Sequence, residues 1–186
     1  MKTILPYLLV LFAAVLWGTT GTAQTFLPQT AQPLTIGASR LAIGGFSLLI
    51  IMLWMKKINF STWPWKLTII TAFCMALFQP LFFTSVRVTG IAIGTVVAIG
   101  SSPVFSGMIE WLFLKMKPSR AWGIATTLSV IGCSLLFLNK DALIVQPFGV
   151  ILSLIAGFVF AIYTMISKSL LAKVDAIPAV AMTFSI

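Results

Sequence analysis

Arg40 and Glu110 are charged side chains inside long apolar segments, where a charge is costly and therefore informative. Arg40 lies within the first two turns of the apolar run 34–55, and Glu110 lies about one turn before the end of the run 91–114. A guanidinium binds carboxylate or phosphate through paired hydrogen bonds, so Arg40 is a candidate ligand-binding residue. Proton coupling requires a carboxylate whose charge the surroundings disfavour, and Glu110 is the candidate for that role. Structural alternatives exist for both: Arg40 can extend to the lipid headgroups, and Glu110 can pair with a nearby lysine.

Two prolines mark further candidate positions, because each follows polar residues near the middle of an apolar run. Pro80 comes after Gln79, and Pro103 comes after Ser101 and Ser102. A proline inside a helix removes one backbone hydrogen bond and frees the carbonyl four residues before it. Such carbonyls are tolerated in a membrane where they meet protein partners or line a water-filled cavity. We expect helix breaks at Pro80 and Pro103, with uncharged polar contacts from Gln79, Ser101 and Ser102. The alternative is simple bending for packing.

Aromatic and hydroxyl side chains complete a candidate cavity lining. Trp17, Thr20 and Gln24 lie on one helical stripe, since residues three and four apart share a helix face. A tryptophan facing a pore suits a substrate with both apolar and polar parts, although packing between helices is the common use of such a stripe. The residues expected to line a central substrate cavity are Trp17, Thr20, Arg40, Gln79, Phe83, Ser102 and Tyr163.

The elements that must position these side chains are transmembrane helices. Of the 186 residues, 60% are apolar and 8% are charged, whereas soluble domains carry about 25% charged residues. Continuous apolar runs match a hydrocarbon layer of ~30 Å and do not alternate as β-barrel strands would. The sequence therefore predicts an all-α polytopic bundle. Six complete spans are expected, at residues 5–25, 34–55, 67–88, 91–114, 122–138 and 148–167, and a seventh begins near Ile177 and is expected to be cut at Ile186.

Basic residues gather on one side of the predicted membrane. With the amino terminus in the cytoplasm, nine Lys and Arg residues fall on the cytoplasmic side and two, Arg87 and Lys140, on the other. This asymmetry predicts a cytoplasmic amino terminus in a multi-pass protein of the cell membrane. A cleaved signal peptide is the alternative for the first run, but five more spans follow it. The net charge of +9 is then explained by topology and anionic lipid, and nucleic acid is not an expected partner.

The first and sixth spans show a weak internal repeat. At an offset of 144, Leu8 aligns with Leu152 and Ala13 with Gly157, and Pro33 falls within one position of Pro178. A unit of five spans has an odd number of crossings, so a second copy must be inverted, as in many secondary transporters. We expect a complete first repeat at residues 1–139 and the start of a second at 140–186, from a parent protein of roughly 290 residues.

Short motifs follow one another in a consistent order along the chain. They are Trp17-Gly18, Pro33 followed by Arg40, Gly94 with Ser102-Pro103-Val104-Phe105, the stretch from Gly123 to Gly132, and Ala161-Ile162-Tyr163. In these features the chain resembles, over essentially its whole length, the ten-span EamA-type transporters of the drug/metabolite transporter superfamily. It departs from them at Lys115-Met116, where such proteins usually carry a Gly-Glu pair, so a family salt bridge at that turn is in doubt.

The resemblance implies a secondary transporter that exports or imports small metabolites or drug-like compounds by alternating access, and export is the direction we expect. It also implies that further carboxy-terminal spans are needed for a complete pathway. Two other classes stay open: a membrane-embedded enzyme and an assembly subunit that transports nothing. The chain has no histidine and lacks the clustered acids and metal ligands that such enzymes use. We therefore expect no enzymatic activity, no cofactor and no metal, with a small molecule and the bilayer as partners.

Overall fold

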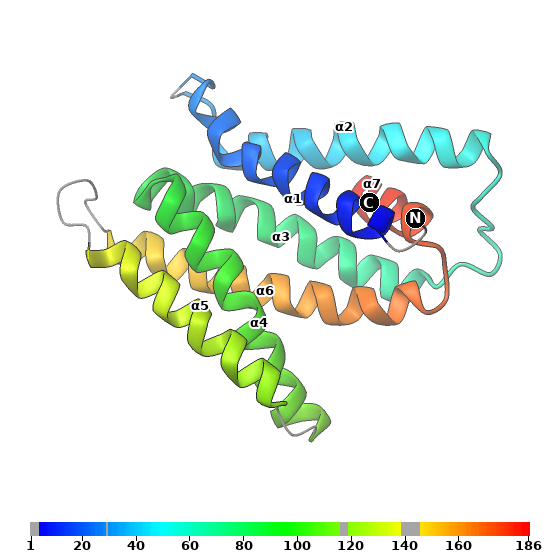
Figure 1. Cartoon of the computed structure of the whole chain (residues 1–186). Coiled ribbons are helices and arrows are strands. Elements are labelled where there is room, and N and C mark those ends of the chain that lie inside the picture. The colour runs from blue at the N-terminus through cyan, green and yellow to red at the C-terminus, as the bar shows by residue number, and fades with distance from the viewer. Residues whose placement is uncertain (1–3, 29, 116–118, 139–145) are drawn as a thin grey trace. The chain divides into compact units, whose positions relative to one another are not determined.

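The computed structural model describes residues 4–28, 30–115, 119–138 and 146–186, and all the regular structure among them is helical. The helices are α1 (Ile4–Thr25), α2 (Pro33–Trp54), α3 (Trp65–Thr89), α4 (Ile91–Leu114), α5 (Arg120–Leu138), α6 (Pro147–Leu171) and α7 (Ala176–Ser185) (Figure 1). The all-α polytopic fold predicted from the sequence is confirmed. The expected boundaries agree with the observed ones to within a few residues.

Five of the described helices are long and apolar enough to cross a membrane: α1, α2, α3, α4 and α6. The protein is therefore a multi-pass membrane protein. The sequence predicted six complete spans, and the helix left outside this set is α5. It is a 19-residue helix that begins at Arg120 and carries several Ser and Thr side chains. The short α7 spans 10 residues.

The helices fall into two compact units, Met1–Gln32 and Pro33–Ile186. The first contains α1, whose membrane-spanning window buries none of its residues. In the second unit α3 is the central helix, with α2 and α7 on one side and α6 and α4 on the other (Figure 1). More than half of its span is buried, which is the pattern of a helix that is surrounded by other helices.

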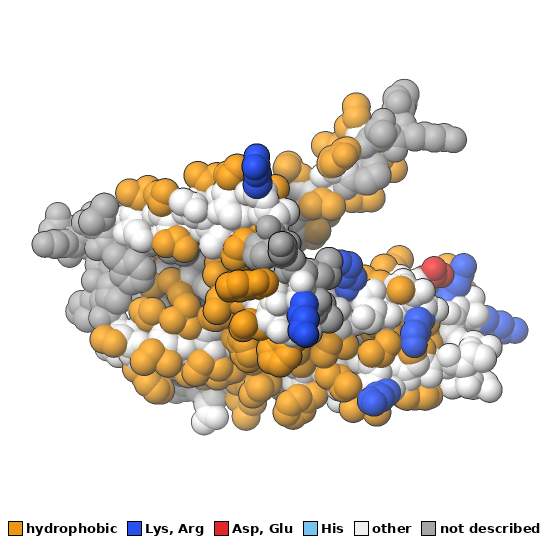
Figure 2. All heavy atoms as spheres, turned by 90° about the horizontal axis from the view of Figure 1, so that it is seen from below, with side chains coloured by type: hydrophobic (Ala, Val, Ile, Leu, Met, Phe, Trp, Pro, Cys, Tyr) orange, Lys and Arg blue, Asp and Glu red, His pale blue; other side chains and the backbone are white. Residues whose placement is uncertain are grey.

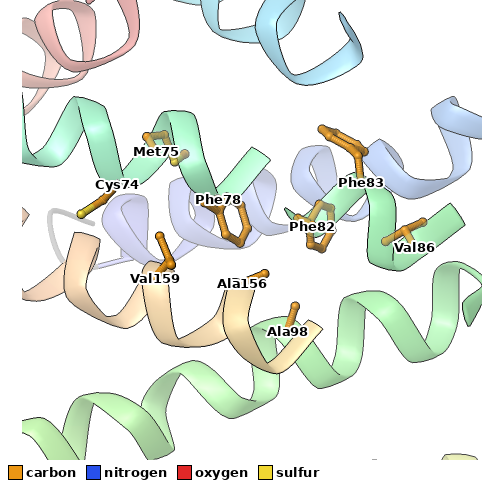
Figure 3. Packing of buried hydrophobic residues seen from close by; sticks show 9 residues of the cluster. All are labelled: Cys74, Met75, Phe78, Phe82, Phe83, Val86, Ala98, Ala156 and Val159. Carbon is orange, nitrogen blue, oxygen red and sulfur yellow. The ribbon is translucent and has the colours of Figure 1, made fainter. Parts of the chain in front are cut away.

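The core of the second unit lies where α3 meets α6 and α4. Phe78 and Phe82 of α3 point toward Ala156 of α6 and Ala98 of α4, whereas Phe83 points to the opposite side of α3 (Figure 3). Small residues on α6 let the helices approach closely, as is usual in membrane bundles. The buried small residues on this face are Gly149, Ser153, Ala156, Gly157 and Ala161.

A one-residue turn and a buried hydrogen bond fix the helices on either side of α3. Gly90 alone joins α3 to α4, with a φ of 84° that an L side chain rarely adopts. On the other side, the hydroxyl oxygens of Thr71 on α3 and Thr183 on α7 lie 3.2 Å apart, both buried. A buried hydrogen bond of this kind joins membrane helices where apolar burial alone cannot.

Candidate functional site

Arg40 and Phe83, two residues singled out in the sequence, meet between α2 and α3. The guanidinium carbon of Arg40 lies 5.4 Å from the centre of the Phe83 ring, which is within the range of a cation–π interaction. One turn away, Gly37 faces Gln79, and a Cβ added at Gly37 would stand 2.7 Å from the Cβ of Gln79. The spacings i, i+3 on α2 and i, i+4 on α3 place these four residues on facing helix surfaces. We call them the Arg40 group.

Gln79 differs from the other buried polar residues of α3. The hydroxyls of Thr71, Ser85 and Thr89 donate to carbonyls three or four residues earlier in the same helix, at 2.7 to 3.0 Å. Such local bonds are the usual way for a helix to bury a hydroxyl. The Oε1 of Gln79 is buried without a hydrogen-bond partner. An unsatisfied buried acceptor costs about 1–3 kcal/mol, so this position favours a ligand that donates a hydrogen bond.

Arg40 also lacks an obvious counter-charge. Within the described ranges of the chain no carboxylate pairs with its guanidinium, and its recorded polar contact is the ring of Phe83. Arg40 is exposed and lies about two turns into α2, so in a membrane its charge costs up to about 2.5–3.5 kcal/mol, the value for the helix centre on insertion scales. A single cation–π contact offsets roughly 0.5–2 kcal/mol of such a cost. The part of the cost that the ring contact does not offset favours a negatively charged partner for the guanidinium.

A series of ring contacts connects the Arg40 group to Tyr163 on α6. Neighbouring ring centres lie 4.9 to 5.7 Å apart along the order Phe83, Phe82, Phe78, Phe160 and Tyr163. These distances fall in the range of favourable aromatic pairs. The ring contacts therefore link Phe83, beside Arg40, to Tyr163 on α6.

Both prolines lie inside continuous helices, Pro80 in α3 and Pro103 in α4. The breaks that we expected are thus not interruptions, because a helix can lose one backbone bond and still continue. Around Pro103 the neighbouring helix α5 supplies donors: Trp122 Nε1 donates to the Pro103 carbonyl at 3.0 Å and Ser129 to the Gly100 carbonyl at 2.8 Å. Neither acceptor is the carbonyl that Pro103 frees, which is that of Ile99, so these bonds tie α5 to α4 beside the proline and do not replace the lost bond.

The remaining candidates lie elsewhere. Ser102 is buried in α4, and among the described residues no recorded hydrogen bond or ring contact joins it to the Arg40 group. Glu110 is half-buried near the end of α4, and its carbonyl accepts the Lys115 N–H that caps the helix. Trp17 and Thr20 lie on α1, in the first compact unit, so the structure describes them within that unit alone.

An apolar groove of about 320 Å³ lies between α4, α5 and α6, near Ser101, Ser129 and Leu154. The groove is lined by Ser101, which was expected to supply a polar contact beside Pro103, but by none of the seven residues expected to line the central cavity. As for metals, the described residues contain no group of three or more His, Cys, Asp or Glu that could hold an ion.

Sequence reasoning missed several residues that shape this region. Gly37, Phe160 and Trp122 were not singled out, because each is an apolar or small residue whose role depends on the helix opposite. A partial signal exists for Trp122, since its indole N–H needs an acceptor in an apolar span. Gly37 precedes Arg40 by three residues, which places the two on one face.

Comparison with known proteins gives a family match. The profile described as the EamA-like transporter family matches residues 4–138. A similar protein is the "Uncharacterized transporter YwfM" of Bacillus subtilis (strain 168), which is 47% identical over 171 residues. The match covers 92% of this chain and 58% of that relative, so the chain spans less than two thirds of the relative's length. No solved structure matches.

Proposed function

The chain belongs to the EamA-like transporter family, and from that premise we propose that it forms part of a secondary transporter for small molecules. We propose transport in preference to enzymatic chemistry or a purely structural role. The name of the Bacillus relative, which includes the word transporter, supports this choice. The expected substrates are small metabolites or drug-like compounds, and export is the proposed direction.

The observation that carries the proposal is the Arg40 group. It combines a guanidinium without a carboxylate partner in the described structure and a buried amide oxygen without a donor. Both groups lie within membrane-spanning helices, where unpaired polar groups are expensive and usually functional. A substrate with an anionic group and an adjacent N–H or O–H would satisfy both at once.

We propose an alternating-access mechanism because the sequence contains an internal repeat. The family match ends at residue 138, close to residue 139, where we end the first repeat. In the repeat alignment α7 corresponds to α2, and the two helices pack against each other. Contact between equivalent helices supports a two-fold relation between the halves, about which one repeat can rock against the other. Reading the encoding gene past Ile186 tests the repeat: four further spans are expected, and their absence would contradict it.

The protein is proposed to lie in the cell membrane with its amino terminus in the cytoplasm, because basic residues predominate on that side. Two single-cysteine variants test this orientation. Lys57 lies in the connection between α2 and α3, and Arg87 lies near the other end of α3. We expect a membrane-impermeant thiol reagent to label Arg87→Cys in intact cells and Lys57→Cys only after lysis. The reverse pattern would contradict the orientation.

Transport itself is tested by accumulation in cells. Cells that express the complete protein, including the further carboxy-terminal spans, should retain less of a labelled small organic anion than cells that express its Arg40→Gln variant, because export requires the guanidinium. Arg40→Lys is the matched variant that keeps the charge and removes the planar fork. Equal retention in cells with the native protein, the Gln variant and no protein would contradict the proposal.

A further inference from the structure

A polar groove lies at the end of α2 that is far from the Arg40 group. It is a groove of about 450 Å³ between the connection that follows α2 and the turn between α6 and α7. Figure 2 shows Lys and Arg side chains, with an acidic side chain among them, toward the end of the molecule where α6 is followed by α7. The polar and aromatic residues that line the groove are Lys57, Asn59, Thr62, Trp63, Lys173 and Asp175.

The backbone holds Lys57 in place. The N–H of Lys57 donates to the Met52 carbonyl and the N–H of Lys56 to the Leu53 carbonyl, both at 3.0 Å. This pair of bonds is a Schellman motif, which normally has glycine at the left-handed position. Here Lys56 occupies that position with a φ of 52°. The sequence thus accepts a strained residue at the end of α2, and this arrangement fixes the start of the groove.

Hydrogen bonds also hold the backbone on the other side of the groove. The N–H groups of Lys173 and Val174 both donate to the Leu170 carbonyl, at 2.9 and 3.1 Å. Opposite them, Trp63 is buried and its Nε1 donates to Thr68 at 2.9 Å, which ties the loop to α3. The two lysines therefore stand on fixed backbone at either side of one hollow.

The charges of the lining indicate the kind of ligand. Two ammonium groups, Lys57 and Lys173, face one carboxylate, Asp175, so the lining carries a net charge of +1. Asp175 immediately precedes α7, where the positive end of the helix dipole offsets part of its charge. Such a lining matches a singly charged anion, and Asn59 and Thr62 add uncharged donors.

The position of the groove indicates the source of the ligand. The groove lies beside the ends of the membrane-spanning helices α2 and α6, so it opens at the level of the lipid headgroups. It lies on the side that the proposed orientation places in the cytoplasm, and the inference rests on that orientation. Basic hollows between membrane helices on the cytoplasmic side bind anionic headgroups. We propose that this groove binds the phosphodiester of an anionic phospholipid, with Lys57 and Lys173 contacting the phosphate oxygens. A water-soluble phosphodiester has the same chemistry and is the competing source.

Thermal unfolding of the purified chain in a neutral detergent tests the proposal. Phosphatidylglycerol should raise the Tm by several degrees, whereas phosphatidylcholine with the same acyl chains should not. The rise should disappear in the double variant Lys57→Gln/Lys173→Gln and persist in Lys66→Gln, an exposed lysine near the start of α3 that is not among the lining residues. A rise that survives in the double variant, or equal effects of the two lipids, would overturn the site.

Two further measurements complete the test. Soluble glycerophosphoglycerol should fail to raise the Tm; if it protects as well as the lipid, the lipid source is wrong. Should the double variant not fold, acetylation of the native chain replaces it. Phosphatidylglycerol should slow acetylation of Lys57 and Lys173 and leave Lys66 unchanged, and equal rates at all three lysines would overturn the proposal.

Discussion

The guanidinium of Arg40 lies over the ring of Phe83, 5.4 Å from its centre, and so couples α2 to α3 inside the membrane-spanning region. The contact orients the arginine across the helix interface, where the unpartnered Gln79 amide oxygen lies one turn of α3 away. Phe83 itself is buried, with 1% of its surface exposed. The ring thus serves as a fixed platform for a charge that has no carboxylate partner in the described residues.

Gln79→Leu should separate stability from function. Leucine has a similar size and no acceptor to leave unsatisfied, so the variant should gain about 1–3 kcal/mol of unfolding free energy. Substrate binding should weaken, because the donor on the substrate loses its acceptor. Thermal unfolding and transport assays measure the two effects. A variant that is less stable than the native protein would contradict the assignment of Oε1 as an unsatisfied acceptor.

Gly45→Ala tests the contact between α2 and α7. An added Cβ at Gly45 would collide with the backbone of Phe184 and Ser185, and overpacking of this kind typically costs about 1–3 kcal/mol. The matched control is the adjacent Gly44→Ala, because nothing lies within 4 Å of its added Cβ. The control should be neutral or slightly stabilising. Equal effects of the two substitutions would contradict the close approach of α7.

Trp122→Phe tests the role of α5 at Pro103. The substitution removes the 3.0 Å hydrogen bond to the Pro103 carbonyl and preserves most of the ring. We expect a loss of about 0.6 kcal/mol, the average measured for hydrogen bonds between membrane helices, and at most about 1.7 kcal/mol. Trp54→Phe is the control, since Trp54 is 86% exposed. If both variants unfold alike, the hydrogen bond does not anchor α5.

The helices were predictable because each apolar run is longer than the ~30 Å hydrocarbon layer requires, and short polar connections separate the runs. Arg40 and Gln79 were predictable as candidates, since a polar side chain in an apolar run is conspicuous. What the sequence could not indicate is which helix faces which. The pairing of Arg40 with Phe83 depends on Gly37 admitting Gln79, and a glycine in an apolar run has many possible uses.

The continuation of α3 through Pro80 and of α4 through Pro103 has a similar explanation. Proline removes one backbone bond, and the remaining bonds of the helix carry it through. Beside Pro103, Trp122 and Ser129 of α5 donate to the carbonyls of Pro103 and Gly100 and so tie α5 to this stretch of α4. Their distance along the chain from the proline hides this relation in the sequence.

Flux across vesicles that contain the complete protein, with the further carboxy-terminal spans that the repeat predicts, tests the central claim most directly. Benzenesulfonate and trimethylphenylammonium have similar size and opposite fixed charge, so neither crosses the lipid unaided. We predict carriage of the anion in preference to the cation, and a loss of about 10- to 100-fold in anion flux in Arg40→Gln, since a hydrogen bond to a charged group contributes about 1.5–3 kcal/mol. Equal flux of the two ions, or an anion flux that Arg40→Gln leaves unchanged, would contradict the role proposed for Arg40.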